Sequence, residues 1–423
     1  MELRIEPSQL HGQIPIPASK SHTIRAVIIA SLAAGSSTIR NPLWSGDTAS
    51  AVSTCQALGA EIETGEVWTL RGTGGKIRAP ENVIDVGNSG TTLYLALTMA
   101  ALGAGYSVFT GDEQIRKRPV QPLLEALRSL GAEAFSTRGN GLAPVVVRGP
   151  LRGGRVEIHC PTSQYLSSLL LSCPLAQGDT EIQVLSLNER PYVRMTLDWL
   201  EDQGIRYAAE GMEHFAIPGG QAYRPFDKAV PADFSSATFF LCAAAITGSD
   251  LTLQGLDMHD SQGDKAVVQM LEAMGARIEV RPEGIRVCGG SLKGGEFDLN
   301  ATPDALPAMA VVGCCAQGET RLVNVPQARL KETDRIAVMR ETLTRMGGQV
   351  EELPDGLILR QSRLRGTHLP GYGDHRVVMA LAVAGLVAEG ETVVDTAEAI
   401  RVTFPNFVEL MQQVGGKVEW QEI

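Results

Sequence analysis

Two series of glycines run through this 423-residue chain with the same period of about 70 residues. The first series consists of Gly59, Gly131, Gly204, Gly275, Gly347 and Gly415. The second series consists of Gly35, Gly105, Gly178, Gly248, Gly318 and Gly390. Because two coincident series rarely arise by chance, the sequence predicts six copies of one structural unit of roughly 70 residues.

Each copy follows the same order of sequence patterns. A very apolar helical segment ends near a second-series glycine, which we expect to form a left-handed helix C-cap. A short strand, a polar loop and an amphipathic helix follow, and that helix ends at a first-series glycine before another strand. The apolar segments, such as 93–102 and 377–387, have no polar face and are therefore expected to be buried. They are too short to span a bilayer, which takes about 18–20 apolar residues.

The length of the chain predicts two domains, because one hydrophobic core rarely serves so many residues. Six units divide most simply into two groups of three, and the proline-punctuated segment 224–232 lies near the midpoint. The first strand, residues 2–5, precedes the first helix and is expected to join the C-terminal half. We therefore predict an α/β (α+β) fold with residues 15–227 in one domain and residues 1–14 plus 228–423 in the other.

Composition excludes several classes of function. The formal net charge of −11 argues against binding to nucleic acid, which requires a basic surface. The first residues show no basic segment followed by an apolar run, so no secretory signal is expected. The seven cysteines contain no C-x-x-C pair and favour free thiols in a reducing compartment. These observations predict a cytoplasmic protein without a membrane segment.

Polar residues begin each of the six apolar helices. They include Lys20-Ser21-His22-Thr23, Asn88-Ser89-Gly90-Thr91-Thr92, Thr162-Ser163-Gln164, Asp233, Asp304 and Asp374-His375-Arg376. Each could simply be an N-cap. If three repeats pack about a pseudo-threefold axis, however, three helix N-termini converge on one face of each domain. Two such faces would form a cleft that favours a ligand with several negative charges.

Basic residues in the loops could supply matching charge. Arg118 precedes a proline, and Lys331, Glu332 and Arg335 combine acid and base within one helical turn. Arginine offers a fork suited to carboxylate or phosphate, whereas lysine provides a point charge or a proton. These loops strengthen the expectation of an anionic ligand.

The motifs together resemble those of the 5-enolpyruvylshikimate-3-phosphate (EPSP) synthase family. The resemblance rests on Lys20-Ser21-x-x-x-Arg25, Gly87-Asn88-Ser89-Gly90-Thr91, Arg118-Pro119, Ser163-Gln164, Asp233-x-Ser235-Ser236, Pro303-Asp304-Ala305, Lys331-Glu332-Thr333-Asp334-Arg335 and Asp374-His375-Arg376. They occur in the family's order along essentially the whole chain. The resemblance implies an inside-out α/β barrel of six βαβαββ-type repeats, three per domain, with a hinge and an active site in the interdomain cleft.

The resemblance also implies an activity. The family transfers the enolpyruvyl group of phosphoenolpyruvate to the 5-hydroxyl of shikimate 3-phosphate by addition and elimination, and releases phosphate. This step belongs to the shikimate pathway towards chorismate and the aromatic amino acids. The family needs no metal and no organic cofactor, and its members are commonly monomeric. We therefore expect a monomer whose partners are these two small molecules.

The resemblance assigns three groups of site residues. Lys20, Asp304 and Glu332 are expected to transfer protons, with Asp304 at the 5-hydroxyl. Shikimate 3-phosphate is expected to contact Lys20, Ser21, Arg25, Thr162, Ser163, Gln164, Tyr192, Asp304, Gln327 and Lys331. Phosphoenolpyruvate is expected to contact Lys20, Asn88, Gly90, Arg118, Gln164, Arg335, His375 and Arg376.

Three residues depart from the family pattern. Tyr94 stands where an arginine is usual, Val402 where a lysine is usual, and Glu189 where a serine usually contacts the 3-phosphate. The first two changes remove positive charge, which predicts a weaker response to glyphosate. Tyr94 is interpreted as a core aromatic, and Arg401 is one candidate to replace the missing lysine. Glu189 is either rotated away, paired with Arg190 or Arg194, or a sign of a different acceptor.

Three alternatives remain. A transferase of the same branch could use another phosphorylated cyclic acceptor, as Glu189 suggests. The sibling enolpyruvyl transferase that acts on UDP-N-acetylglucosamine usually carries a cysteine in the loop equivalent to residues 111–119, and here that loop has none. A ring-shaped DNA clamp also contains six related units, but it would need basic rather than apolar helices.

Overall fold

The computed structural model describes residues 1–422 and divides the chain into two compact units. The N-terminal unit is Ala18–Val230, and the C-terminal unit combines Met1–Pro17 with the chain from Pro231 onward. Both divisions fall a few residues beyond the expected ones at 14/15 and 227/228. The reason at the second division is that strand β14 (Asp227–Ala229) pairs with β3 (Ser36–Arg40) in the N-terminal unit.

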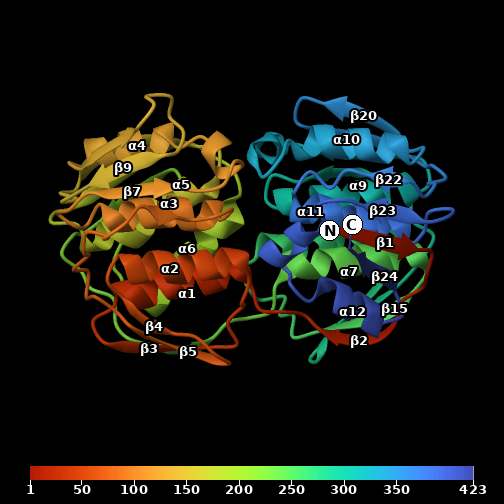
Figure 1. Ribbon diagram of the computed structural model, residues 1–423, viewed down its shortest axis with the longest axis horizontal. Helices are drawn as coiled ribbons and strands as arrows, with labels where there is room; N and C mark the ends of the chain where they lie inside the picture. The colour runs from red at the N-terminus through yellow and green to blue at the C-terminus, as the bar shows by residue number, and fades with distance from the viewer. Residues whose placement is uncertain (423) are drawn as a thin grey trace. The chain divides into compact units, whose positions relative to one another are not determined.

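Each unit contains three four-stranded sheets, and all six sheets have the same topology. Figure 1 shows one of these sheets through its neighbouring strands β3, β5 and β4. Two neighbouring strands run parallel, and the third and fourth are antiparallel additions. The sheets of the N-terminal unit are β14-β3-β5-β4, β6-β7-β9-β8 and β10-β11-β13-β12. Their remaining strands are β4 (Glu61–Glu63), β5 (Val67–Arg71), β6 (Ile84–Asp85), β7 (Ser107–Thr110), β8 (Glu133–Ser136), β9 (Val145–Arg148), β10 (Gly154–Cys160), β11 (Thr180–Leu187), β12 (Ala208–Glu210) and β13 (His214–Ile217).

The C-terminal unit repeats this arrangement with sheets β2-β15-β17-β16, β18-β19-β21-β20 and β22-β23-β1-β24. Its strands are β1 (Glu2–Glu6), β2 (His11–Pro15), β15 (Asp250–Gln254), β16 (Arg277–Arg281), β17 (Gly284–Cys288), β18 (Glu296–Asp298), β19 (Glu319–Val323), β20 (Gln349–Leu353), β21 (Gly356–Arg360), β22 (His368–Leu369), β23 (Thr392–Val394) and β24 (Lys417–Gln421). Strand β1 pairs with both β23 and β24, so the start of the chain completes the last sheet. The six predicted repeats are therefore confirmed.

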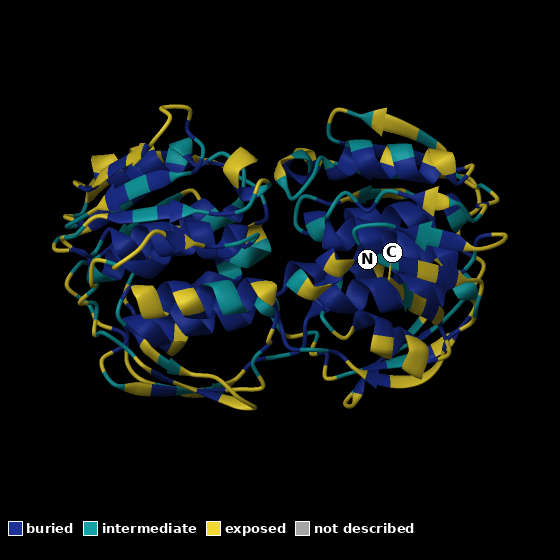
Figure 2. Cartoon of the chain, viewed as in Figure 1, coloured by how far each residue is buried: buried dark blue, intermediate teal, exposed yellow. Residues whose placement is uncertain are grey.

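Six buried helices form the interior of the two units (Figure 2). They are α1 (Lys20–Leu32), α3 (Gly90–Ala100) and α5 (Ser163–Ser172) in one unit, and α7 (Phe234–Thr247), α9 (Leu306–Cys315) and α11 (His375–Gly385) in the other. Every residue of α3 and α11 is buried. Sheets and amphipathic helices surround them, which is the inside-out α/β architecture that the family resemblance implies.

The outer helices of the two units are α2 (Gly46–Ala57), α4 (Gln121–Ser129), α6 (Arg190–Asp202), α8 (Ala266–Met274), α10 (Arg335–Arg345) and α12 (Phe407–Gln413). Short 3-10 helices are η1 (Ile115–Lys117), η2 (Cys173–Leu175), η3 (Gly263–Lys265), η4 (Pro303–Ala305), η5 (Pro326–Leu330) and η6 (Ala397–Val402). Within residues 1–422, no helix has both the length and the hydrophobicity that crossing a membrane requires.

The predicted helix starts are confirmed, and they separate into two kinds. In five of the six buried helices, the N-cap side chain accepts a hydrogen bond from a backbone N–H of the first turn; these caps are Ser19, Ser89, Thr162, Asp233 and Asp374. Helix α9 differs, because Asp304 lies in η4 before it and does not cap it. The Asp304 carboxylate can therefore contact other groups.

The prediction for the second glycine series is partly wrong. All six first-series glycines have positive φ, but in the second series Gly105 and Gly178 do not. Of the second series, Gly248 alone stands directly at the C-cap of its helix, with φ 69°. Gly105 is required for a steric reason instead, because an added Cβ would lie 2.4 Å from the Cβ of Ala79.

Candidate active site

The predicted residues fall on both units. The N-terminal half-site is defined here as the residues around the N-termini of α1, α3 and α5. The C-terminal half-site is defined as the residues around Asp304, Arg335 and the N-terminus of α11. Each half-site combines cationic side chains with the free N–H groups of a buried helix.

In the N-terminal half-site, α1 presents a lysine that already has a carboxylate partner. Lys20 Nζ lies 3.1 Å from Oδ2 of Asp47, and both side chains are largely buried. Asp47 lies in the first turn of α2, and its backbone carbonyl accepts a hydrogen bond from Thr92 of α3. Asp47 therefore ties Lys20 to the neighbouring helix, a role that sequence reasoning missed because the two residues are remote in sequence.

Arg25 is buried one turn further along α1, with 2% of its surface exposed. Its guanidinium donates to Thr196 Oγ1 at 2.9 Å, to the Tyr192 carbonyl at 3.1 Å and to the Ser21 carbonyl at 3.1 Å. Burial lowers the pKa of Arg25 to about 10, so the side chain is still charged at neutral pH. All these acceptors are uncharged, and a buried arginine held in this way favours an anionic ligand.

Arg118 lies against the N-terminus of α3. A Cβ added to Gly90, the first residue of α3, would lie 2.2 Å from Nη1 of Arg118, so only glycine permits this approach. Asn88 donates to Asp112 at 2.6 Å and to Gln114 at 2.7 Å, which positions the loop that leads to Arg118.

Tyr94 is a buried core residue, as interpreted from the sequence, and it also supports this loop. Its ring packs edge-on against Tyr165 with centroids 5.1 Å apart. Both hydroxyls donate to the carbonyl of Pro119, Tyr94 at 3.1 Å and Tyr165 at 2.6 Å. Two tyrosines thus hold the residue that follows Arg118.

The N-terminus of α5 carries Thr162, Ser163 and Gln164. Gln164 Oε1 is buried and has no hydrogen-bond partner among the described residues. Ser163 and Thr162 both donate to the carboxylate of Glu189, which is itself buried. Arg190 and Arg194 are directed to other acids, Glu213 in one case and Asp198 with Glu201 in the other. Glu189 is therefore neither rotated away from the predicted site nor bound by those arginines.

The C-terminal half-site is built around one buried arginine. Arg335, with a side chain 1% exposed, donates to Asp304 at 2.7 Å and to Asp374 at 2.9 Å, and it also pairs with Glu332. Burial disfavours its charge, but the three carboxylates outweigh burial and raise the pKa of Arg335. Arg376 Nη2 lies 3.0 Å from the other oxygen of Asp304. The structure thus joins three of the predicted segments through their side chains.

Gln327 and Lys331 are two further predicted residues of this unit. Gln327, 2% exposed, donates to the Asn300 carbonyl at 3.0 Å, while its Oε1 has no hydrogen-bond partner among the described residues. Lys331 is half-buried at the end of η5. Asp374, which the sequence predicts as a helix start and part of a motif but not as a site residue, is fully buried and binds Arg335, Thr333 and the backbone N–H of Arg376.

His375 is buried at the start of α11 with its Nε2 lacking a hydrogen-bond partner in the described part of the chain. Burial lowers the pKa of His375 to about 3, and of the neighbouring charges Glu332 opposes this shift most. The imidazole is therefore neutral at physiological pH and can donate or accept one hydrogen bond to a ligand.

The low pKa of His375 predicts an acid-sensitive fold. Between pH 6.5 and about 3 the unfolded chain binds a proton that the folded chain excludes, so stability falls as the pH drops. We expect His375→Gln to reduce the slope of unfolding free energy against pH by about 1.4 kcal/mol per pH unit in this window. Urea unfolding at pH 4, 5 and 6 measures that slope, with the exposed His11→Gln as control. Equal slopes in His375→Gln and the wild type would contradict the prediction.

Arg401 and Val402 lie in η6. Arg401 is exposed, and its guanidinium stacks over the Trp420 ring at 5.2 Å from the centroid. Val402 ends η6. The structure therefore engages Arg401 with an aromatic ring of β24, and this contact gives no support to its replacing the missing lysine.

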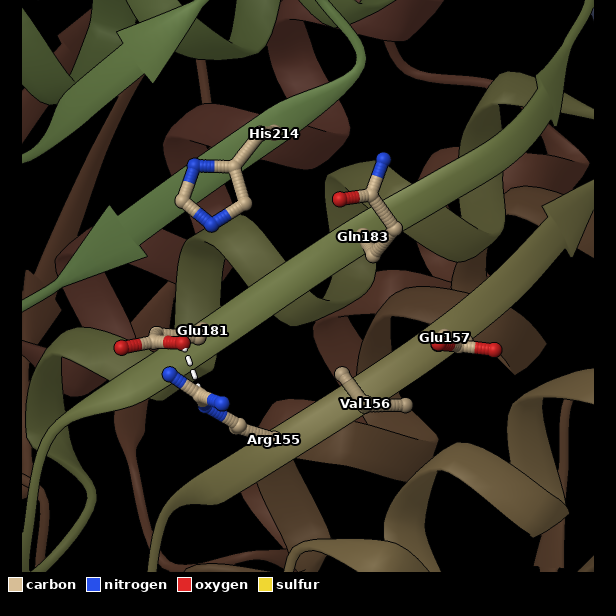
Figure 3. Close-up of a pocket in the computed structure, with 6 residues that line it drawn as sticks. All are labelled: Arg155, Val156, Glu157, Glu181, Gln183 and His214. Atoms are coloured by element: carbon tan, nitrogen blue, oxygen red, sulfur yellow. Dashed lines mark ion pairs between the residues drawn. The ribbon is translucent and has the colours of Figure 1, made fainter.

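A surface pocket on the sheet of β10, β11 and β13 involves none of the predicted residues (Figure 3). It is lined by Arg155, Val156, Glu157, Glu181, Gln183 and His214, and Arg155 forms an ion pair with Glu181 at 2.6 Å. Its one arginine is already paired with Glu181, whereas the hydrogen-bond acceptors of Arg25 are uncharged. The two half-sites are therefore the stronger candidates.

Chemically, the half-sites offer two kinds of group. Arg25, Arg118 and the N-termini of α3 and α5 can bind anions. Asp304 and Glu332, each hydrogen-bonded to Arg335, are carboxylates that can exchange protons with a substrate.

The chain is similar in sequence and in structure to known proteins. A family model described as EPSP synthase (3-phosphoshikimate 1-carboxyvinyltransferase) matches residues 5–411. A 3-phosphoshikimate 1-carboxyvinyltransferase of Acetivibrio thermocellus is 58% identical over 419 residues, covering 99% of both chains. One from Ruminiclostridium cellulolyticum is 56% identical, covering 99% of this chain and 100% of the relative. The solved EPSP synthase of Acinetobacter baumannii superposes with a TM-score of 0.84 at 28% identity, covering 100% of both chains.

Proposed function

This chain belongs to the EPSP synthase family, and on that premise we propose that it transfers the enolpyruvyl group of phosphoenolpyruvate to the 5-hydroxyl of shikimate 3-phosphate. The enzyme is thus a carboxyvinyltransferase of the shikimate pathway. The observation that carries the proposal is the cluster in which Arg335 and Arg376 hold the carboxylate of Asp304. It places a proton-transfer group among cations that suit anionic substrates.

In this proposal both half-sites contribute residues that bind the same pair of substrates. The N-terminal half-site supplies helix N-termini and arginines, and the C-terminal half-site supplies the acids. The anion-binding residues Arg25 and Arg118 belong to the N-terminal half-site. The proton-transfer residues Asp304 and Glu332 belong to the C-terminal half-site. Substrate binding would therefore require both units.

Arg25 and the residues around it would bind the acceptor. Its guanidinium has uncharged partners only, so the carboxylate of shikimate 3-phosphate would supply the missing negative charge. Arg25 donates hydrogen bonds to the carbonyls of Ser21 and Tyr192. It also donates to Ser167 of α5, the helix that begins with Ser163. Lys331 and Gln327 would contact the acceptor from the C-terminal unit.

Phosphoenolpyruvate would take the remaining cations. Arg118 beside Gly90 and Arg376 beside His375 are at helix N-termini, where an anion is favoured. Lys20 and Gln164 would complete this subsite. Arg335 is already bound to three carboxylates, so its contact with substrate would require one of them, Asp304 or Glu332, to turn towards the reacting atoms.

The proposed chemistry is an addition followed by an elimination. The methylene carbon of phosphoenolpyruvate gains a proton while the 5-hydroxyl oxygen bonds to the adjacent carbon and gives up its own proton. The tetrahedral adduct then breaks its bond to the phosphate oxygen, and the new methyl group returns a proton. Asp304 would take the hydroxyl proton, and Glu332 with Lys20 would serve the methylene carbon.

Release of phosphate from phosphoenolpyruvate, measured with and without shikimate 3-phosphate, tests the function directly. We expect release that depends on shikimate 3-phosphate and is unaffected by UDP-N-acetylglucosamine. Release that requires the nucleotide sugar instead, or no release with either acceptor, would reject the proposal.

The proposal predicts a specific effect at Gly90. In Gly90→Ala the new methyl group would meet Arg118 Nη1 at 2.2 Å, so the guanidinium must move away from α3. Loss of one charge-assisted contact, about 1.5–3 kcal/mol, corresponds to an increase in KM for phosphoenolpyruvate of about 10- to 100-fold. Steady-state kinetics with each substrate varied in turn measure this effect. Because Arg118 is assigned to phosphoenolpyruvate, an equal increase in KM for shikimate 3-phosphate would contradict the assignment.

We also propose that the enzyme is a cytoplasmic monomer. All seven cysteines are free, as suits a reducing compartment, and burial raises the pKa of Cys55, Cys173 and Cys315 to about 12. One chain carries every residue that the mechanism uses, so no second copy is needed. Light scattering at catalytic concentrations would test the monomer.

A further inference from the structure

Glu189 occupies an unusual place for a carboxylate. It is 2% exposed and directly precedes α6, with a left-handed backbone (φ 60°, ψ 41°) that non-glycine residues rarely adopt. Its Oε2 accepts three hydrogen bonds from the start of α5. They come from Ser163 Oγ at 2.8 Å, Ser163 N at 3.1 Å and Thr162 Oγ1 at 3.2 Å.

This arrangement is that of a bound anion. A backbone N–H and two hydroxyls at the N-terminus of a buried helix are the donors that phosphate or carboxylate ligands use. Here one oxygen of the protein's own side chain takes all three. A substrate phosphate cannot use the same hydrogen atoms while the carboxylate remains, and two anions that close would repel each other.

The two arginines that follow Glu189 in the sequence pair with other carboxylates. Arg190, the next residue, pairs with Glu213 at 2.7 Å, and Arg194, one turn further, pairs with Asp198 and Glu201. The carboxylate is therefore directed to α5 although two arginines are close in sequence. The same donors, Thr162 and Ser163, are those that the family resemblance assigns to shikimate 3-phosphate.

We propose that Glu189 is a specificity-determining residue that weakens binding of the acceptor's phosphate, because its carboxylate occupies the phosphate subsite at the N-terminus of α5. The inference rests on the proposed function for the identity of the acceptor. A phosphorylated acceptor binds after Glu189 leaves Ser163 and Thr162, whereas an acceptor with a hydroxyl at this position meets no such competition. Glu189 thereby lowers the ratio of the affinity for shikimate 3-phosphate to the affinity for shikimate.

Two variants test the proposal, Glu189→Gln, which removes the charge at constant size, and Glu189→Ser, which removes the competing group. Calorimetric titration with shikimate 3-phosphate measures affinity without turnover, and titration with shikimate reports the same site without the phosphate. We expect Glu189→Ser to bind shikimate 3-phosphate at least about tenfold more tightly, as one charge-assisted contact implies. Affinity for shikimate should change less than about threefold.

Glu157→Gln is the matched control, because it removes an exposed carboxylate on β10, the strand that precedes α5, and lies outside the subsite. It should leave both affinities unchanged. The selectivity ratio is the decisive quantity, since a purely structural role for Glu189 would lower affinity for both ligands or alter thermal stability alone.

The proposal is overturned if neither Glu189 variant binds shikimate 3-phosphate more tightly than the wild type does. It is also overturned if both ligands gain affinity equally. Failure of the proposed function gives a different result, namely no phosphate release from any variant with shikimate 3-phosphate. In that case titration with inorganic phosphate still reports whether removing the carboxylate opens the subsite, and unchanged phosphate affinity would reject the inference.

Discussion

Asp304→Asn is expected to lower kcat by about 10²- to 10⁴-fold, the usual contribution of a positioned proton-transfer group. The asparagine side chain keeps the size of the carboxylate but cannot take the proton of the 5-hydroxyl. Asp304 does not cap α9 and is 19% exposed at its side chain, so its removal should leave the helix in place. Steady-state assays of phosphate release at saturating substrates measure kcat.

The exposed Asp298→Asn, in the strand before the same helix, provides the control and should retain wild-type kcat. Far-ultraviolet circular dichroism would show that both variants are folded. A kcat for Asp304→Asn within threefold of the wild type would exclude Asp304 as the base and leave Glu332 and Lys20 as the candidates.

Arg335→Gln is expected to lower the free energy of unfolding by about 3–5 kcal/mol, the cost of breaking a buried ion pair by removing one partner. Arg335 is the shared partner of Asp304, Glu332 and Asp374, and its side chain is 1% exposed. Without the guanidinium, the charges of three neighbouring carboxylates repel one another in a site with little water. Urea denaturation at neutral pH measures the loss.

Arg345→Gln on the same helix is the matched control. Arg345 pairs with Glu341, and both side chains are exposed, so its loss should have little effect. If Arg335→Gln were no less stable than Arg345→Gln, the interpretation of Arg335 as the electrostatic centre of the half-site would be wrong. Loss of activity without loss of stability would instead assign Arg335 to substrate binding alone.

The sequence predicted the repeats, the buried helices and most helix starts because these features depend on local patterns. Periodic glycines mark chain reversals, and a Ser, Thr or Asp before an apolar segment marks an N-cap whose hydrogen bond spans two or three residues. Five side chains form such caps. The second glycine series was the exception. Gly105 does not have a left-handed φ, and a glycine is required there because a Cβ would collide with Ala79.

The family motifs also predicted the candidate site residues, but not the groups that each residue contacts. Asn88 was assigned to substrate, and in the structure it binds Asp112 and Gln114 of the loop before Arg118. Tyr94 was interpreted as a core aromatic, and its hydroxyl additionally holds the Pro119 carbonyl. A motif identifies a residue type at a position, whereas a hydrogen bond depends on which group lies opposite it.

By itself, the sequence determined the six repeats, their buried helices and the family to which the chain belongs. The tertiary structure decided the contacts between residues far apart in the chain: Lys20 with Asp47, Arg335 with Asp374, and Glu189 with Ser163. The physical reason is the range of the interactions. Helices, turns and caps are stabilised within a few residues, but side-chain pairing depends on how whole repeats pack, and no local pattern records the direction in which the carboxylate of Glu189 points.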